Sequence, residues 1–313
     1  MSDERRLFLS FSGGETSAYM TQWCLDNWRD KYDDIKVVFA NTGEEREETL
    51  DFVEQCDEHF GFGVVWVEAV VHHGKKKAST HRVVDYKTAS RKGEPFEDVI
   101  SKYGIPNQAF PHCTRELKLS PMRSYLKSVG WETGSYDTAI GIRKDEQQRV
   151  RPKQMEKNRI VYPMVFDNPM TKPEINAFWR SQPFRLQLKG YEGNCKWCWK
   201  KSMRKHLTLL NDRPEFYDFP ELMEKKYGKV GPEFEKHGDN RPSYSSRTFF
   251  RGNLSTLELR DMGKNESFVR AQDDADVYPD SYVRGYELDL LFSGCSEHCE
   301  VFHTDEEIEQ GGM

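Results

Sequence analysis

The stretch that decides the fold is Leu7–Ser17, LFLSFSGGETS, in which a short apolar run meets two glycines and several hydroxyl side chains. A run of this length predicts a buried strand, and the residues after it follow a helical pattern through Cys24. A glycine-rich turn between a strand and a helix directs backbone N–H groups at the positive end of the helix, where an anion is favoured. The segment therefore predicts a phosphate-binding loop.

The alternation of strands and helices continues outward from this loop. Apolar runs predict strands at 35–40 (IKVVFA), 64–71 (VVWVEAVV) and 137–142 (DTAIGI), and a helical period covers 49–60. Residues 72–136 form an excursion outside this alternation, and helical stretches follow at 173–188 and 197–210. Because alternating strands and helices imply right-handed crossovers, we expect an α/β fold with a parallel sheet.

The composition limits the class of protein. The chain has 313 residues, of which 36% are hydrophobic, 31% charged and 13% aromatic, which indicates a packed core with a polar surface rather than disorder. No apolar run approaches the roughly 18 residues of a membrane helix, so we expect no membrane partner. The start, MSDERRLFLSFSGG, lacks the long apolar stretch of a signal peptide, which predicts a cytoplasmic location.

The charge pattern bears on nucleic-acid binding. The net charge of −6 gives no global argument for a nucleic-acid partner. One local basic run stands out, and it is either a solvated helix face or a patch for a polyanion. Its members are Lys196, Lys200, Lys201, Arg204 and Lys205.

The cysteines divide into core and loop residues. Seven cysteines without an export signal argue against disulfides. Cys24 and Cys56 fall in helical apolar patterns, as core residues do. Cys195 and Cys198 form a Cys-x-x-Cys pair, which lets two thiolates meet one metal centre, and the distant Cys113 completes a three-cysteine set.

Four motifs in matching order resemble the adenine nucleotide α-hydrolase superfamily. FLSFSGGETSAYM (8–20) looks like its PP-loop, and FANTGE (39–44) resembles its second-strand motif. CTRELK (113–118), followed by Pro121, resembles its Cys…Lys…Pro segment, and GIRKDE (141–146) its glycine-arginine loop. This superfamily includes N-type ATP pyrophosphatases, PAPS and APS (sulfonucleotide) reductases, tRNA thiolation enzymes and DNA phosphorothioation ATP pyrophosphatases.

The resemblance implies the fold and the nucleotide contacts. It implies a HUP-type, Rossmann-like PP-loop domain over 1–165 and a smaller, mostly helical or irregular C-terminal region over 166–313. It also implies an adenine nucleotide, either ATP with Mg2+ or PAPS/APS. The implied nucleotide contacts are Ser12, Gly13, Gly14, Thr16, Ser17, Asn41, Gly43, Gly141 and Arg143. The chain departs from the family at Glu15, where many members carry Lys or Arg, and an acidic side chain there argues against a direct phosphate contact.

The resemblance extends to a metal site. APS-type reductases hold a 4Fe-4S cluster with a Cys-Cys pair and a Cys-x-x-Cys about eighty residues later. Here Cys195 follows Cys113 by 82 positions, but Thr114 replaces the second Cys of the pair. Three explanations remain: a fourth ligand from the pair at 295 and 299 (Cys295 or Cys299), a cluster with an open iron, or a structural Zn2+ site that includes His112.

Three functions follow from these residues. The favoured one is an ATP pyrophosphatase that adenylates a substrate such as tRNA or DNA for sulfur insertion, with the cluster and a sulfur donor protein, and with Arg143 stabilising the released pyrophosphate. The basic run beside the predicted cluster ligands would then contact the nucleic acid. The second is a PAPS/APS reductase releasing sulfite, in which Cys295 or Cys299 is the nucleophile. The third is a non-catalytic nucleotide- and metal-binding module.

Two observations favour the pyrophosphatase over the reductase. The sequence has no Glu-Cys-Gly-Leu-His element, in which reductases carry their nucleophile. The acidic neighbours Glu297 and Glu300 raise the pKa of a nearby thiol, whereas a nucleophilic thiolate needs a low pKa.

Overall fold

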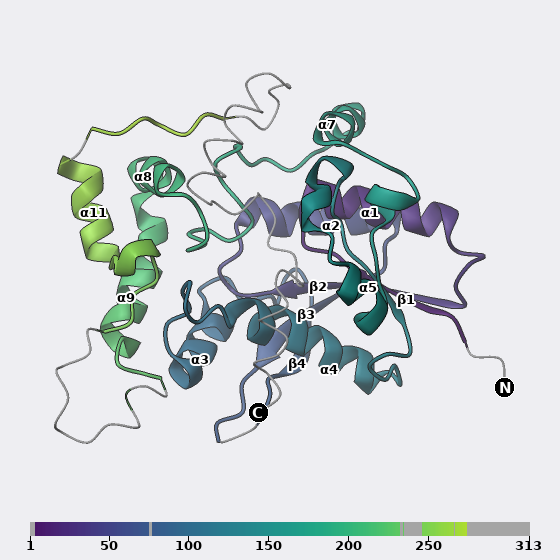
Figure 1. Cartoon of the computed structure of the whole chain (residues 1–313), viewed down its shortest axis with the longest axis horizontal. Coiled ribbons are helices and arrows are strands. Elements are labelled where there is room, and N and C mark those ends of the chain that lie inside the picture. Colours follow the sequence, from purple (N-terminus) through teal and green to yellow (C-terminus); the bar gives the residue numbers. More distant parts are fainter. Residues whose placement is uncertain (1–3, 75–76, 232–233, 235–245, 266, 274–313) are drawn as a thin grey trace.

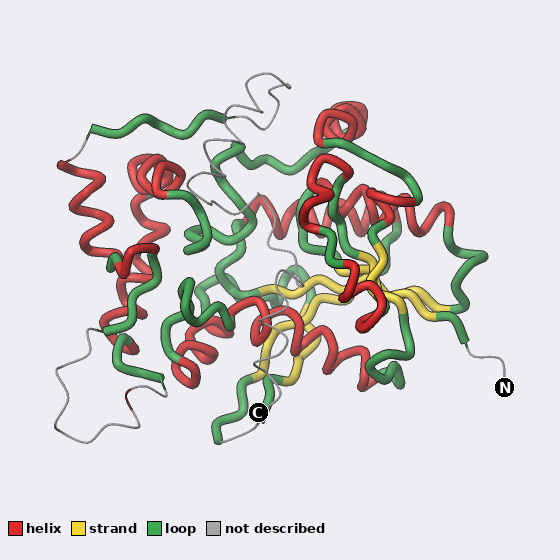
Figure 2. Tube along the Cα trace, viewed as in Figure 1, coloured by secondary structure: helices red, strands yellow, loops and turns green. Residues whose placement is uncertain are grey.

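The computed structural model describes residues 4–74, 77–231, 234, 246–265 and 267–273. Their centre is a six-stranded sheet with the order β4-β3-β2-β1-β5-β6 (Figures 1 and 2). The strands are β1 (Arg6–Ser10), β2 (Asp34–Asn41), β3 (Val64–Val70), β4 (Thr80–Val84), β5 (Asp137–Ala139) and β6 (Ile160–Val161). Every pair is parallel except β3 with β4. The predicted α/β fold is confirmed, and the antiparallel edge strand comes from the excursion at 72–136.

Helices cover both faces of the sheet. The helices are α1 (Glu15–Asn27), α2 (Glu47–Phe60), α3 (Glu94–Tyr103), α4 (Ser120–Ser128), α5 (Pro152–Asn158), α6 (Pro163–Phe166), α7 (Lys172–Ser181), α8 (Met203–Asp212), α9 (Asp218–Tyr227) and α11 (Thr256–Asn265). In Figure 1, α1, α2 and α7 lie on one side of the strands, and α3 and α4 lie on the other. The central strands are therefore buried from both directions.

This double burial explains the uninterrupted apolar runs of the sequence. In β1, Leu7 and Leu9 pack into the cluster that contains α1, α2 and α7 residues, whereas Phe8 packs into the opposite cluster with α4. Alternate side chains of a strand point to opposite faces, so a strand covered on both faces is apolar at every position. The strand predicted at 137–142 ends earlier, at Ala139, because the chain then turns toward α1.

A third apolar cluster joins the C-terminal helices to α3. Its fully buried members include Trp197, Tyr217 and Phe249, and it also contains Val99 of α3. Residues on both sides of position 165 therefore share one core, and the division of the chain at that position stays a prediction. The helices predicted at 173–188 and 197–210 are shorter, as α7 and α8.

The sequence between α7 and α8 explains that shortening. Pro183, Gly190 and Gly193 interrupt helical structure after α7. The second helix begins only after Ser202, whose hydroxyl accepts the N–H of Lys205 as an N-cap. The segment between α7 and α8 contains no helix. It contacts the N-terminus of α1 and the loop before it through Arg185 and Asn194.

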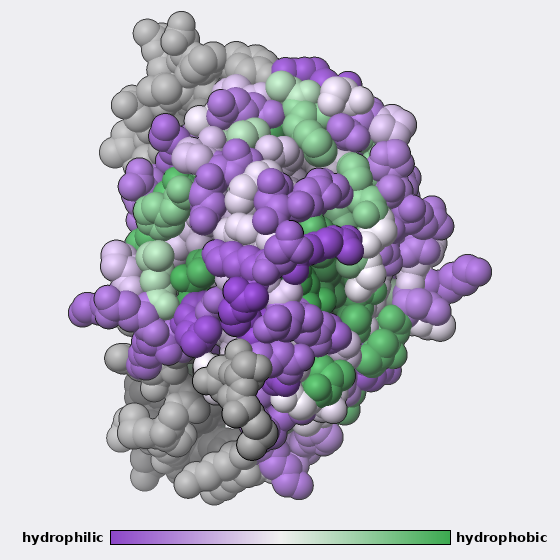
Figure 3. Space-filling view, turned by 90° about the vertical axis from the view of Figure 1, so that its right-hand side faces the viewer, coloured by the Kyte–Doolittle hydropathy of each residue, from purple (hydrophilic) through white to green (hydrophobic). Residues whose placement is uncertain are grey.

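The surface on the N-terminal side is largely hydrophilic, with smaller hydrophobic patches between the polar residues (Figure 3). Within the described ranges, no helix combines the length and the apolar character needed to cross a bilayer.

Candidate functional site

The loop between β1 and α1 is closed by its own hydroxyl groups. Ser17 Oγ donates to the Gly14 carbonyl (2.9 Å), accepts the Ser12 N–H (3.2 Å) and lies 2.9 Å from Ser12 Oγ. Gly13 has φ +80°, and a Cβ at this position would lie 2.8 Å from Thr49 Cγ2. The loop thus needs a glycine for both its backbone angle and the space around it.

This loop leads directly into the N-terminus of α1. Gly14 is the N-cap residue and has no side chain with which to cap the first N–H groups of the helix. These groups and the helix dipole make the end of α1 favourable for an anion. The Thr16 hydroxyl lies in the same first turn.

The end of β5 faces this turn. The Arg143 guanidinium is buried, and its Nη1 donates to Thr16 Oγ1 at 3.2 Å. Asp145 holds the Nε edge of the same guanidinium at 3.0 Å. A Cβ on Gly141 would lie 3.1 Å from the Ser17 Cα, so the backbones meet closely there. The structure therefore brings the two sequence motifs together across the sheet.

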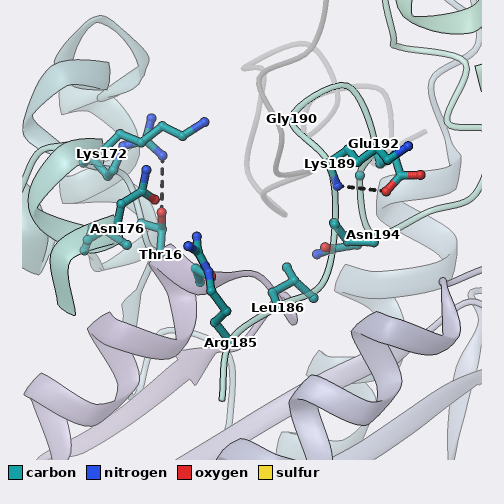
Figure 4. A pocket seen from close by; sticks show the side chains of 14 residues that line it. Thr16, Lys172, Asn176, Arg185, Leu186, Lys189, Gly190, Glu192 and Asn194 are labelled. Carbon is teal, nitrogen blue, oxygen red and sulfur yellow. Dashed lines mark hydrogen bonds and ion pairs between the residues drawn. The ribbon is translucent and has the colours of Figure 1, made fainter. Parts of the chain in front are cut away.

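A pocket opens at this meeting point (Figure 4). About 520 Å3 of empty space, part of it open to solvent, lies within it. Its lining comes from the first turn of α1, from Arg143, from α7 and from the segment 185–194. The lining residues are Glu15, Thr16, Arg143, Lys172, Ile175, Asn176, Arg185, Leu186, Leu188, Lys189, Gly190, Glu192, Gly193 and Asn194.

Much of this lining is absent from the sequence motifs. Asn194 donates to the Ser12 carbonyl at 2.7 Å and accepts from Thr49 Oγ1 at 3.5 Å. It thus anchors the far wall of the pocket, which α7 and the segment 185–194 form, to the loop. It stands directly before the Cys-x-x-Cys pair, and that position was its only signal in the sequence. Lys172 and Arg185 belong to stretches without a recognisable motif, and only the fold brings them to α1.

Glu15, the departure from the family pattern, has a partner in this wall. Its carboxylate holds Arg185 in a two-pronged ion pair, with Nε–Oε1 at 3.0 Å and Nη2–Oε2 at 3.3 Å. Both side chains are mostly buried. A cation therefore stands beside the loop after all, supplied from position 185 rather than position 15.

Asn41 and Gly43 lie elsewhere in the same region. Asn41 is fully buried and donates to Glu68 Oε1 (2.6 Å) and the Ser90 carbonyl (2.8 Å), and it accepts the Gly43 N–H (3.2 Å). It thus ties β2 and β3 to the segment after β4. Neither residue lines the pocket, and their contact with a nucleotide stays a prediction.

The fold and this pocket agree with a comparison to known families. The chain matches the phosphoadenosine phosphosulfate reductase domain over residues 6–169, which is more than half of its length. It belongs to that family. The resemblance to the adenine nucleotide α-hydrolase superfamily is confirmed, and membership implies adenine-nucleotide binding. The segments that form the far wall of the pocket, 172–194, lie beyond the matched residues.

Similar proteins come from a phage and an archaeon. The uncharacterized nin region protein ORF290 of Escherichia phage lambda is 29% identical over 297 residues, which is 94% of each chain. An uncharacterized protein of Methanocaldococcus jannaschii is 24% identical over 245 residues, covering 75% of this chain and 43% of that protein. A second one is 30% identical over 118 residues, covering 38% and 22%.

The segments that carry the loop cysteines meet beside the family domain. Cys195 pairs with Glu45 through a backbone β-bridge. Lys200 Nζ donates to Thr114 Oγ1 at 3.5 Å, and the neighbouring Cys113 packs against the cluster that contains Trp197. Folding therefore brings the 113–114 segment to the Cys-x-x-Cys segment.

Buried acidic side chains, Glu44 and Glu45, lie close to Cys195. Burial raises the pKa of Glu44 to about 7, and burial with the neighbouring Cys198 and acidic groups raises the pKa of Cys195 well above its usual value. Burial also lowers the pKa of His112 to about 3, which keeps its imidazole neutral.

A metal at these cysteines stays a prediction. Among the residues that the structure describes, no three His, Cys, Asp or Glu side chains form a group able to hold a metal. The two remaining candidates, Cys295 and Cys299, fall outside the described residues.

The basic run does not form a solvated helix face. All five of its residues are buried or half-buried. Lys196 Nζ donates to the Arg91 carbonyl at 3.1 Å and lies 3.7 Å from Glu44, and Lys205 Nζ donates to the Gly190 carbonyl at 3.4 Å. These cations hold the segments around the pocket and the cysteines together.

Proposed function

We propose that this chain is an ATP pyrophosphatase-type enzyme that adenylates a substrate. The observation that carries the proposal is the pocket at the N-terminus of α1, where Thr16 and Arg143 meet a loop built around Gly13. A substrate oxygen attacks the α-phosphorus of ATP and forms a new P–O bond. The bond from the α-phosphorus to the bridging oxygen breaks, and pyrophosphate leaves with that electron pair.

The charges of the site suit this leaving group. Backbone N–H groups at the start of α1 and the Arg143 guanidinium are fixed donors that stabilise the charge gained by pyrophosphate. Bound Mg2+ supplies further neutralisation of the phosphates. Asp145 holds Arg143 in place, so little reorganisation is required during the reaction.

The second half of the proposal concerns the acceptor. We assign a nucleic acid, tRNA or DNA, as the adenylated substrate, and sulfur insertion from a donor protein as the following step. Support comes from the sequence around the pocket residue Asn194, because Lys196 lies within the Cys-x-x-Cys pair that directly follows it and Lys200 lies just after that pair. Because the described residues do not assemble a metal-binding group, we derive no step through a 4Fe-4S cluster, which stays a prediction.

The family match favours one alternative, a sulfonucleotide reductase. In that reaction a cysteine thiolate attacks the sulfate sulfur of PAPS or APS, and a thiol reductant then releases sulfite. The raised pKa of Cys195 opposes its use as a thiolate in the absence of a metal. The remaining candidates for the nucleophile are Cys295 and Cys299.

Product analysis of the full chain separates these reactions. We expect AMP and pyrophosphate from ATP and Mg2+, at a rate that rises when the correct nucleic acid is added and falls in Arg143→Gln. Arg180→Ala, an exposed change on α7 outside the pocket, is the matched control. Sulfite released from PAPS or APS with a thiol reductant, and lost in Cys295→Ser or Cys299→Ser, would identify a reductase instead. ATP binding with neither product would indicate the non-catalytic module.

A further inference from the structure

The far wall of the pocket is cationic and lies outside the family domain. Of its lining residues, Lys172, Arg185 and Lys189 all come after position 169, where the match to the family ends. Arg143, which also pairs with Asp145 and Glu146 outside the lining, brings the lining cations to four. The lining contains two carboxylates, those of Glu15 and Glu192.

Both carboxylates already have cationic partners. Glu15 is held by Arg185, and Glu192 pairs with Arg46 (2.7 Å), which is buried behind the pocket wall. A wall of this kind does not repel an anion as two unpaired carboxylates would. The Lys172 side chain is only 7% exposed. An anion close to it stabilises the charged form of such a buried ammonium group.

The wall is fixed relative to the phosphate loop. Trp179 of α7 donates its indole N–H to the Glu15 carbonyl at 2.9 Å, and the rings of Tyr19 and Phe178 lie 4.8 Å apart between the two helices. The Glu15 carboxylate in turn orients the Arg185 guanidinium. These contacts hold the cations at a set position above the first turn of α1, as Figure 4 shows for Arg185 and Lys172.

We infer that Lys172, Arg185 and Lys189 bind the terminal phosphates of the nucleotide, the part that leaves as pyrophosphate. This inference rests on the proposed function and adds a phosphate-binding wall from beyond the family domain. Its consequence is that the terminal phosphates are recognised without the nucleoside. Inorganic pyrophosphate and tripolyphosphate then bind to the pocket on their own.

Calorimetric titration of the full chain with four ligands in Mg2+ buffer tests this inference: ATP, AMP, inorganic pyrophosphate and adenosine 3′,5′-bisphosphate. We expect Lys189→Ala and Arg185→Ala each to weaken pyrophosphate and ATP about tenfold, as loss of one charge-assisted contact does, and to change AMP affinity less than twofold. Lys189 is exposed, so its variant keeps the test valid if loss of the Glu15–Arg185 pair impairs folding. Arg180→Ala, an exposed change on α7 outside the pocket lining, should change none of the affinities.

The outcomes distinguish the two levels of the argument. No binding of any adenine nucleotide would overturn the proposed function itself. Normal ATP binding with no pyrophosphate binding, or an equal loss of AMP and pyrophosphate affinity in the variants, would overturn only the cationic wall. Tight binding of adenosine 3′,5′-bisphosphate that depends on Arg185 and Lys189, without pyrophosphate binding, would assign the wall to a sulfonucleotide and contradict the inference.

Discussion

Replacing Gly13 with alanine tests the geometry of the phosphate loop. The backbone there has φ +80°, a region that costs an L-residue about 1–2 kcal/mol. The added Cβ would lie 2.8 Å from Thr49 Cγ2 and 3.1 Å from both Phe39 Cε2 and Val53 Cγ2. Because these contacts come from three side chains of one packed core, the Cβ has no direction in which to move, and overpacking of this kind costs about 1–3 kcal/mol. We therefore expect a loss of about 2–5 kcal/mol in the free energy of unfolding.

Gly130 supplies the matched control. It has φ +84°, and a Cβ built on it meets nothing within 4 Å. Gly130→Ala therefore carries the backbone cost of about 1–2 kcal/mol without the steric one. Urea unfolding followed by tryptophan fluorescence measures both variants, and the difference between them isolates the packing around the loop. Equal losses in the two variants would refute the argument that the core encloses the loop.

Three further predictions concern the ligand, the metal and the pH. Gly14→Val should abolish ATP binding by blocking the approach of the phosphates to the backbone; unchanged affinity in calorimetry would make the loop an ordinary turn. Protein purified without oxygen should be brown and contain iron and sulfide, and alanine at Cys113, Cys195 or Cys198 should bleach it, whereas colourless protein with stoichiometric zinc would assign a structural site. Burial lowers the pKa of His206 from 6.5 to about 3. Below pH 6.5 the unfolded chain therefore binds a proton that the folded protein does not bind, and the free energy of unfolding decreases as the pH falls from 6.5 toward 3. The wild type should thus lose about 1.4 kcal/mol more per pH unit than His206→Gln in acid urea titrations, and parallel curves would contradict the assignment.

The sequence predicted those parts of the fold that depend on local pattern. The strand–loop–helix unit at Leu7–Ser17 follows from an apolar run, two glycines and a helical period, all within one short stretch. The antiparallel pairing of β4 was missed, because β4 is partly exposed and its apolar pattern is weak. Edge strands of this kind are defined by the partner that they pair with rather than by their own composition.

The far wall of the pocket could not be predicted for a different reason. Lys172 and Arg185 belong to no recognisable sequence motif. They enter the pocket lining only because α7 packs on α1 through Trp179. Asn194 was quoted as part of the cysteine motif, yet its side chain serves the loop at Ser12. Tertiary contacts between distant segments carry this information, and the local pattern does not.

The exchange of charge between positions 15 and 185 shows how the departure from the family pattern is compatible with phosphate binding. An acidic residue in the first turn of a helix is favourable to the helix itself, because it neutralises the positive end of the dipole. That same neutralisation would compete with a phosphate at the end of α1. The two-pronged pair with Arg185 engages both carboxylate oxygens of Glu15, so the helix end and the Thr16 hydroxyl keep their attraction for an anion. The Arg185 guanidinium is thereby held in the pocket wall, beside the first turn of α1.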